Sequence, residues 1–467
     1  MDARAGSSKS TSILNGITYA PEHKVLLAAF NKHIATELQH KLDHPGAVAK
    51  TLHAHGLGFV KANWPGVKID VEDADAYFIK LAEKYHGTIP GPLHRLVCRA
   101  FTQTREVEPF ADTSMQVVDV MDEFGIWPDE HYESNGYSMG EIAHIVLTLL
   151  TKAKAKRPFI DFADMVWLPI INNWVKPAYS LVVIDEAQDM NPGQIELAIR
   201  SSKNRVAVVG DIFQCIYQFR GADANTIGKL QTRLSAQTLP LTVSFRCPKK
   251  VVQEAKVLVP DFEEWEGAKE GSIHTIPWKQ LNSTVGPKDF VLSRTNAVLS
   301  KAAFGMLKAG ISVQILGKDI GARIIKVIQA RKAKDIVDLM SKIKAWSNEE
   351  QAKAIAANRK AKAAAIQDQA DTIIALAEEC KTIPQLIATI ENLFDDDKKD
   401  PVICSTVHKA KGLEANNVFI LMESFAWLKK ITANDPEEAQ AERNIEYVAI
   451  TRSKDKLYRV TGKSSDI

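Results

Sequence analysis

The stretch Leu181-Val182-Val183-Ile184-Asp185-Glu186-Ala187-Gln188-Asp189 decides the fold, because its apolar run stops abruptly on a pair of carboxylates. A run of this kind, closed by charge and followed by turn residues, predicts a strand buried on both faces of an α/β sheet. Ligands bind at the carboxyl ends of such strands. If the sheet hydrolyses a nucleotide, Asp185 would bind magnesium and Glu186 would orient or deprotonate the attacking water. The alternative is a strand that simply ends in a solvated turn.

Chain length and cysteine content bound the class of protein. The chain has 467 residues, of which 45% are hydrophobic, and this predicts two or more domains with filled cores. Its five cysteines include no Cys-x-x-Cys pair, which argues against a disulfide framework and against a zinc or iron-sulfur site. We therefore expect reduced, intracellular thiols at Cys98, Cys215, Cys247, Cys380 and Cys404.

Charge and hydropathy exclude further classes. With 59 basic and 57 acidic side chains the net charge is +2, so any surface for nucleic acid must be a local groove. No window approaches the roughly 18 apolar residues that a membrane span needs, and the first residues show no signal-peptide core. We therefore expect a cytoplasmic protein that makes no contact with a membrane.

The N-terminal stretch Ala3-Arg4-Ala5-Gly6-Ser7-Ser8-Lys9-Ser10-Thr11 is similar to a phosphate-binding loop. In such a loop, backbone N–H groups and a lysine bind the β- and γ-phosphates, and a hydroxyl reaches magnesium. Lys9 and Ser10 suit these two roles. The residues that would surround the nucleotide are Gly6, Ser7, Ser8, Lys9, Ser10 and Thr11. The alternative is a terminus that is merely rich in serine and lysine.

Two features of this loop depart from the usual pattern. Ser8 stands where a glycine normally precedes the lysine, and its Cβ restricts the backbone where the loop must approach phosphate. No strand is expected before the loop, because the chain starts at Met1. The loss of a strand that normally lies inside the sheet would expose hydrogen-bonding edges and weaken the first domain. We therefore expect a chain that is truncated at its phosphate loop.

Three more strands are predicted around the carboxylate pair. Residues 24–30, 47–52 and 206–211 are apolar runs, and the helix predicted from Gln194 to Ser201 separates the last run from the pair. This order is that of a repeated β-α-β unit, in which the loops after the strands face one crevice. The first two runs are followed directly by polar residues, Asn31 and His53.

The segment after the last of these strands combines aromatic and basic residues. Gln214 can donate a hydrogen bond to a phosphate or a water molecule. Tyr217, Phe219 and Arg220 offer aromatic faces and a cation, the combination that binds single-stranded nucleic acid without sequence preference. For Phe219 the alternative is packing in the core.

Several motifs in chain order resemble those of UvrD/Rep-type superfamily one DNA helicases. Residues 185–189, and residues 210–211 together with 214–222, are similar to the second and third motifs of that family. The fourth, fifth and sixth motifs are matched by Ser-Phe-Arg-Cys-Pro at 244–248, Thr-Val-His-Lys-Ala-Lys-Gly-Leu-Glu at 406–414 and Glu-Tyr-Val-Ala-Ile-Thr-Arg at 446–452. Residues 29–32 and 51–53 are similar to the segments that contact DNA in this family.

The resemblance implies two RecA-like P-loop NTPase motor domains that hydrolyse ATP with Mg²⁺ in the cleft between them. It also implies movement along single-stranded DNA, typically 3′ to 5′, with duplex junctions as substrates in DNA repair and replication. The catalytic residues would be Glu186, Gln214, Arg246 and Arg452, with the two arginines stabilising charge at the γ-phosphate. Glu414 would contact the nucleotide. DNA would be bound by Phe30, Asn31, His53, Tyr217, Phe219, Arg220, Thr406 and His408.

The same resemblance divides the chain into an α/β protein with two motor domains and two helical insertions. The first motor domain would comprise residues 1–58 and 161–234, with an insertion at 59–160. The second would comprise residues 235–317 and 398–467, with an Ala- and Lys-rich insertion at 318–397. The basic run at 152–157 would touch a phosphate backbone or form a solvated helix face, and 318–397 has the alternative of a solvated helical spacer.

Two other functions are open alongside the ATP-dependent helicase. The loss of the first strand and the serine at position 8 suit a DNA-binding remnant that keeps the groove but does not turn over ATP. A nucleotide-regulated protein without a DNA partner is disfavoured by the cluster of Tyr217, Phe219 and Arg220. The sequence identifies no protein partner.

Overall fold

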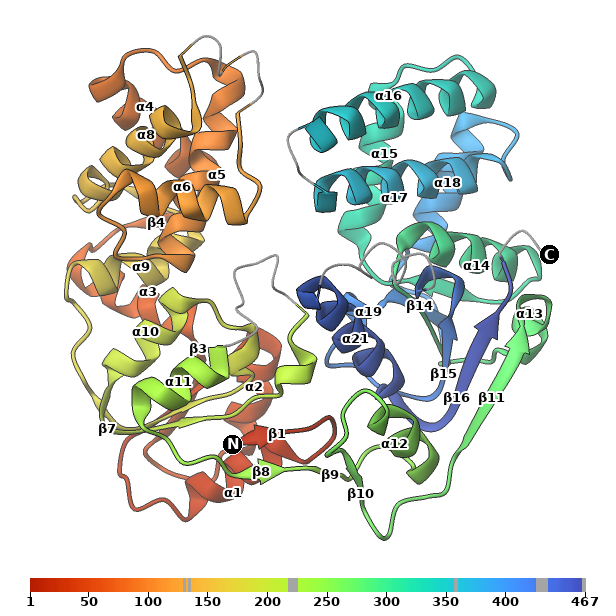
Figure 1. Ribbon diagram of the computed structural model, residues 1–467, viewed down its shortest axis with the longest axis horizontal. Helices are drawn as coiled ribbons and strands as arrows, with labels where there is room; N and C mark the ends of the chain where they lie inside the picture. The colour runs from red at the N-terminus through yellow and green to blue at the C-terminus, as the bar shows by residue number, and fades with distance from the viewer. Residues whose placement is uncertain (129–131, 133–135, 217–225, 357–359, 426–435, 464–467) are drawn as a thin grey trace. The chain divides into compact units, whose positions relative to one another are not determined.

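The computed structural model describes residues 1–128, 132, 136–216, 226–356, 360–425 and 436–463 (Figure 1). The chain forms two compact units. Unit 1 contains Met1–Ala3 and Ser8–Leu241, whereas unit 2 contains Arg4–Ser7 and Thr242–Ile467. The N-terminal stretch that resembles a phosphate-binding loop is thus divided between the two units.

Unit 1 is built on a parallel sheet whose strands are ordered β3-β2-β6-β7. These strands are Ala47–Thr51, Val25–Ala29, Tyr179–Ile184 and Ser202–Val208. The strands predicted at 24–30, at 47–52 and before Asp185 are therefore confirmed. The fourth ends at Val208, earlier than the sequence predicts, and Leu52 begins α3 instead of ending β3.

Burial on both faces explains why the central strands are continuously apolar. Alternate residues of a strand point to opposite faces. Leu26 and Val182 belong to one hydrophobic cluster, whereas Leu27 and Val183 belong to another. The helices of this unit that pack around the sheet are α1 (Lys9–Thr18), α2 (Lys32–Lys41), α3 (Leu52–Asn63), α10 (Pro192–Ser201) and α11 (Thr226–Leu234).

A short strand, β1 (Asp2–Ala3), precedes the phosphate-loop stretch, so the prediction of a missing strand is wrong. It pairs in parallel with β8 (Pro240–Leu241) and forms a bridge from Asp2 to Gly210. The Ala3 N–H donates to the Gly210 carbonyl at 2.8 Å, and the N-terminal ammonium group donates to the Val208 carbonyl. Three residues are enough to make these hydrogen bonds, because pairing needs only backbone groups.

A helical insertion lies between β3 and β6. It contains α4 (Val71–His86), α5 (Gly91–Val107), α6 (Ser114–Glu123) and α8 (Met139–Lys152), which are orange and gold in Figure 1. The small parallel pair β4 (Lys68–Ile69) and β5 (Phe159–Ile160) closes its base. These helices share a hydrophobic core that includes Phe78, Phe101 and Trp167.

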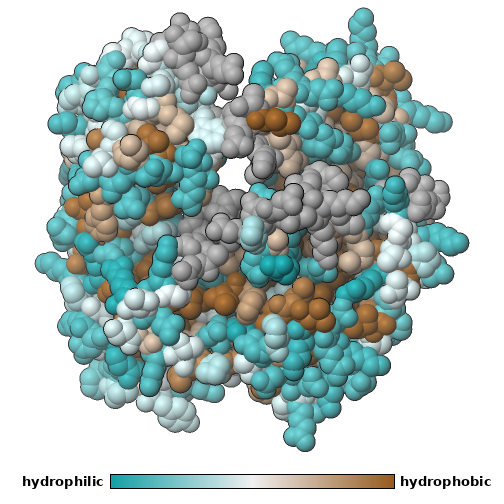
Figure 2. Space-filling model, in the orientation of Figure 1, coloured by the Kyte–Doolittle hydropathy of each residue, from teal (hydrophilic) through white to brown (hydrophobic). Residues whose placement is uncertain are grey.

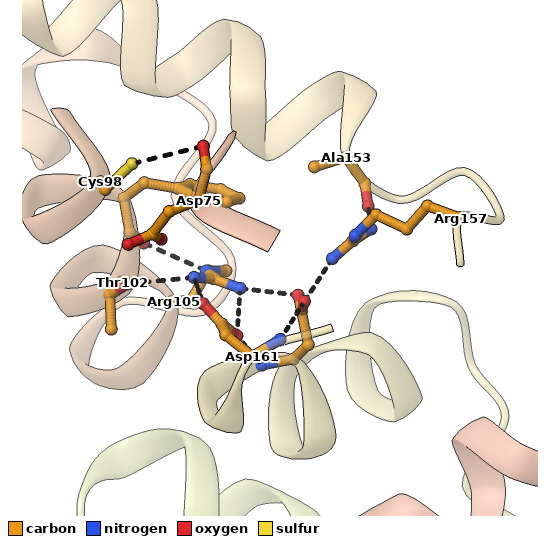
Figure 3. A network of polar contacts seen from close by, with 9 residues as sticks. Asp75, Cys98, Thr102, Arg105, Ala153, Arg157 and Asp161 are labelled. Carbon is orange, nitrogen blue, oxygen red and sulfur yellow. Dashed lines mark hydrogen bonds and ion pairs between the residues drawn. The ribbon is translucent and has the colours of Figure 1, made fainter. Parts of the chain in front are cut away.

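Buried charges join this insertion to α9 (Phe162–Ile171), the helix that precedes β6 (Figure 3). Arg105 of α5 donates to Asp161 at 3.0 Å and to Asp164 at 2.6 Å, and Arg157 donates to Asp164. All four side chains are almost fully buried. Burial opposes ionisation of Asp161, but the charge of Arg105 outweighs it and lowers the pKa of that carboxyl. Arg105 and Arg157 thus bind both carboxyls inside the helical core, although burial and then the charge of Asp161 raise the pKa of Asp164.

Unit 2 is built on a six-stranded parallel sheet with the order β11-β16-β15-β12-β14-β13. In that order the strands are Ser272–Pro277, Ser453–Thr461, Ala415–Leu421, Phe290–Ser293, Val402–Thr406 and Val313–Ile315. A separate two-stranded parallel pair joins β9 (Val243–Ser244) to β10 (Glu263–Glu264). The helices include α12 (Lys249–Lys256), α14 (Asn296–Lys308), α19 (Val407–Ala410) and α21 (Pro436–Ile450).

The Ala- and Lys-rich segment folds into α15 (Lys318–Ala330), α16 (Ile336–Ala356), α17 (Lys360–Ala377) and α18 (Ile383–Leu393). Its residues Ile373 and Leu376 belong to the same hydrophobic cluster as Val291 of β12. Asp368 of α17 also accepts hydrogen bonds from the backbone N–H groups of Asn296 and Ala297 at the start of α14. The alternative of a solvated spacer is therefore wrong.

Hydrophilic residues make up most of the face shown in Figure 2, with hydrophobic residues scattered among them. Across the described ranges, no helix combines the length and the apolar character that crossing a bilayer would require.

Candidate active site

The carboxylate pair lies at the carboxyl end of β6, as the sequence predicts. Asp185 is buried, and one of its oxygens accepts the backbone N–H of Glu186 at 2.9 Å. Glu186 has φ 51 and ψ 43, in the left-handed region that residues with a Cβ rarely adopt. Backbone strain of this kind is found at functional sites, where the surrounding structure holds it in place.

Lys9 is the first residue of α1, and its ammonium group meets the carboxylate pair. Its Nζ lies 3.1 Å from both Glu186 oxygens. Burial alone would lower the pKa of Lys9, but the charges of Glu186, Asp211 and Asp185 together raise it. Burial and then the charge of Glu186 raise the pKa of Asp185, and Lys9 opposes this effect. Lys9 is therefore protonated and positively charged beside the carboxylate pair.

A chain of amide contacts extends this cluster to the next strand end. Gln188 donates to Glu186, and its side-chain oxygen accepts the Asp211 backbone N–H at 3.0 Å. Gln214 donates to the Asp211 carboxylate at 2.7 Å. The sequence predicts Gln214 as a site residue but predicts no role for Gln188 or Asp211. Both residues lie in the loops that follow the neighbouring strands β6 and β7, and this location is the signal that could have identified them.

The backbone of Ser8 has φ 60 and ψ 34, a left-handed conformation in which glycine is favoured. The expectation that this position suits glycine therefore holds. Ser8 is also the N-cap of α1, and within the described part of the chain its side chain makes no capping hydrogen bond. Ser10 and Thr11 are exposed in the first turn of that helix.

The preceding residues Arg4–Ser7 make their contacts inside unit 2. The Arg4 guanidinium donates to both oxygens of Asp261 at 2.9 and 2.6 Å, and the Ala5 N–H donates to the Tyr447 hydroxyl at 2.9 Å. The Gly6 carbonyl accepts the Phe245 N–H at 2.8 Å. Ser7 Oγ is buried and has no hydrogen-bond partner among the described residues. A buried hydroxyl in this condition suits a phosphate oxygen, so the loop fits a nucleotide.

Two predicted arginines of unit 2 have different surroundings. Arg246 Nε lies 2.6 Å from Glu414 Oε2, and Lys454 Nζ lies 3.3 Å from Oε1 of the same carboxylate. Arg452 is buried, with nitrogens 2.9 Å from the Val448 carbonyl and 3.2 Å from the Leu413 carbonyl. Glu414, predicted to contact nucleotide, is thus positioned by two cations.

Magnesium is predicted at Ser10 and Asp185. The described residues contain no group of three or more His, Cys, Asp or Glu side chains that could hold a metal ion. Magnesium in nucleotide sites is commonly held by one or two protein oxygens together with substrate phosphates and water. Ser10 and Asp185 are donors of that kind, and their role stays a prediction.

The residues predicted to bind DNA are distributed over both units. Asn31 is exposed and caps α2, where its side chain accepts the Ile34 N–H at 2.9 Å. His53 Nδ1 lies 3.5 Å from Gln194 Nε2, and burial lowers the pKa of His53. Phe30 is half-buried at the end of β2, and Thr406 and His408 lie at the start of α19. Tyr217, Phe219 and Arg220 lie outside the described residues. Contact with DNA stays a prediction for all of them.

Comparisons with known proteins point to one family. Residues 2–235 match the UvrD/REP helicase N-terminal domain, and residues 327–464 match the UvrD-like helicase C-terminal domain. F-box DNA helicase protein 1 of Schizosaccharomyces pombe is 25% identical over 97% of this chain and 54% of that protein. ATP-dependent DNA helicase PcrA of Bacillus subtilis is 25% identical over 41% of this chain and 30% of that protein. This chain thus spans about half the length of the yeast relative.

Proposed function

This chain belongs to the UvrD/Rep helicase family, and we propose that it hydrolyses ATP to move along single-stranded DNA and unwind duplex junctions, stepping 3′ to 5′. The observation that carries the proposal is the contact of Lys9 with Glu186 beside Asp185. A cation that can bind phosphate, a carboxylate that can act on water and a carboxylate suited to magnesium meet at one sheet edge.

The proposed chemistry uses the partners that these residues have in the structure. Lys9 exchanges the Glu186 carboxylate for phosphate, since a lysine ammonium binds either anion. Glu186 then accepts a hydrogen bond from the attacking water, and Gln188 holds that carboxylate in place through its amide. Ser10 and Asp185 would hold Mg²⁺, which supplies charge neutralisation when it is bound.

The proposed coupling to DNA runs through Gln214. Its amide donates to Asp211, and the Asp211 backbone is bound by Gln188, the residue that contacts Glu186. Gln214 shortly precedes Tyr217, which is predicted to bind DNA. A change of DNA contact in that segment would therefore alter the hydrogen bonds that position Glu186.

A second candidate function is DNA binding without turnover of ATP. The left-handed backbone of Ser8 supports it, because a residue with a Cβ costs free energy in this conformation just before Lys9. The two functions differ in nucleotide binding: the helicase requires it, whereas the second function does not.

The test is ATP hydrolysis by the whole chain with and without single-stranded DNA, together with unwinding of duplexes that carry a 3′ or a 5′ tail. We expect hydrolysis that DNA stimulates and unwinding from the 3′ tail only. Lys9→Ala should abolish both. DNA binding without any nucleotide binding would establish the second function instead, and equal unwinding from both tails would contradict the direction.

A further inference from the structure

One carboxylate of unit 2 is shared by two cations that come from different elements. Arg246 Nε lies 2.6 Å from Glu414 Oε2, whereas Lys454 Nζ lies 3.3 Å from Oε1 of the same side chain. The exposed fraction is 25% for the Arg246 side chain, 38% for Glu414 and 39% for Lys454. Each cation uses its own carboxylate oxygen, so either ion pair can persist when the other is broken.

The backbone on both sides of Glu414 is held by Arg452. The Arg452 guanidinium donates to the Leu413 carbonyl at 3.2 Å, and the Ala415 N–H donates to the Arg452 carbonyl at 3.1 Å. Ala415 begins β15, which pairs in parallel with β16, the strand that contains Lys454 (Figure 1). The Glu414 carboxylate therefore has a fixed place, and Lys454 reaches it from the neighbouring strand.

The backbone of Arg246 lies against the phosphate-loop residues of the same unit. A Cβ added to Gly6 would be 2.5 Å from the Arg246 Cβ and 3.3 Å from the Arg246 backbone nitrogen. Phe245, the residue before Arg246, donates its backbone N–H to the Gly6 carbonyl at 2.8 Å. The side chain of Arg246 thus begins at the loop, while its guanidinium contacts Glu414.

The contact with Glu414 competes with the role predicted for Arg246. A guanidinium that stabilises charge at the γ-phosphate must leave Glu414 or share it with the phosphate. A carboxylate that lost its only cation would repel the triphosphate and would attract the arginine back. Lys454 removes this conflict, because its ammonium group already contacts the second oxygen of Glu414.

We propose that Lys454 is a positioning residue, the counter-ion that keeps Glu414 neutralised when ATP binds and thereby frees Arg246 for the γ-phosphate. Lys454 acts through Glu414 and does not touch the nucleotide itself. This role rests on the proposed function, because it requires the chain to hydrolyse ATP. The effect of Lys454 on turnover must then depend on the negative charge of Glu414.

The experiment measures DNA-stimulated ATP hydrolysis by the whole chain at saturating ATP. Lys454→Met should lower kcat by about 3- to 10-fold, because the uncompensated carboxylate retains Arg246. Lys454→Arg keeps the positive charge and should recover most of kcat. ADP lacks the γ-phosphate, so calorimetric ADP affinity should fall less than kcat does. An equal fall in both would overturn the proposal, because Lys454 would then contact the nucleotide directly.

A double-variant cycle separates this role from a structural one. In Glu414→Gln no carboxylate holds Arg246, so adding Lys454→Met should not lower kcat any further. The same fold loss of kcat in both backgrounds would overturn the proposal, since Lys454 would then act without Glu414. If Glu414→Gln is itself inactive, the conservative variant decides, and a kcat of Lys454→Arg as low as that of Lys454→Met would overturn the proposal.

Lys456→Met is the matched control, because Lys456 is an exposed lysine of the same strand. It should leave kcat and ADP affinity unchanged. Thermal unfolding shows whether each variant is folded, and Lys454→Gln replaces Lys454→Met if the latter is not. A kcat equal to that of the natural chain would overturn the proposal and leave the proposed function intact. If the natural chain hydrolyses no ATP, the proposed function and the role of Lys454 fail together.

Discussion

The ammonium nitrogen of Lys9 lies 3.1 Å from both oxygens of Glu186, a residue 177 positions further along the chain. The lysine of the phosphate loop and the carboxylate proposed to act on water are therefore partners of each other. A change in either one alters the charge that the other experiences, and variants of the two residues must be interpreted together.

Glu186→Gln should leave ATP and DNA binding intact and reduce DNA-stimulated hydrolysis by about 100- to 10,000-fold, because an amide cannot accept the proton of water. ATP affinity is expected to persist, since the variant removes an anion that competes for Lys9. The measurements are calorimetric ATP affinity and steady-state ATPase activity. Normal turnover in this variant would exclude Glu186 from the reaction.

Ser8→Gly should relieve the left-handed strain, stabilise the protein by about 1 kcal/mol, tighten ATP binding and raise turnover. Ser235→Gly is a matched control, because Ser235 is also a serine with positive φ, at 47°. It should change stability without affecting ATP affinity. If the two variants behave alike toward ATP, the strain at Ser8 has no bearing on the loop.

His55 should make stability depend on pH. Its side chain is buried, and its Nε2 lies 2.9 Å from Ser201 Oγ. Burial and then the charge of Lys50 lower the pKa of His55 to about 4. The folded state then disfavours the proton that the unfolded state binds below about pH 6.5. The contribution of His55 to the free energy of unfolding is thus fully present above that pH and is lost as the pH falls toward 4.

The contribution of His55 should be about 2 kcal/mol between pH 7 and pH 5. Urea denaturation at the two pH values measures it for the natural chain and for His55→Gln. The variant should lose less stability on acidification. An equal loss in both proteins would show that other groups cause the dependence.

Arg105→Met should destabilise unit 1 by about 3 to 5 kcal/mol, because it leaves Asp161 and Asp164 with too little positive charge in the core. The surface pair of Lys41 with Glu37 provides the control, and Lys41→Met should cost less than about 1 kcal/mol. Chemical denaturation measures both. Similar costs for the two variants would mean that the buried network contributes little.

Phe219→Ala should weaken binding of single-stranded DNA by about 1 to 3 kcal/mol if a base stacks on this ring. Phe162→Ala replaces another phenylalanine, one that is 57% exposed on α9, and should leave DNA affinity unchanged. Fluorescence anisotropy with labelled DNA gives the affinities. Unchanged DNA affinity together with a lower melting temperature would favour core packing of Phe219.

Local sequence determined the elements that carry the site. Strands that are buried on both faces need unbroken apolar runs, so the apolar run before Asp185 predicts a strand from the sequence alone. The sequence also predicts the backbone conformation at Ser8, because a position that normally takes glycine requires backbone angles that serine adopts only under strain. The order of the motifs indicated the family for the same reason: each motif is a short stretch with its own chemistry.

Tertiary structure alone decided which of these stretches meet. The contacts of Lys9 with Glu186, of Gln188 with Asp211 and of Asp368 with the start of α14 join residues far apart in the sequence. So does the pairing of β1 with β8, which corrected the prediction of a missing strand. Such contacts depend on how strands align and helices pack, and residue patterns within a single stretch carry no information about that alignment.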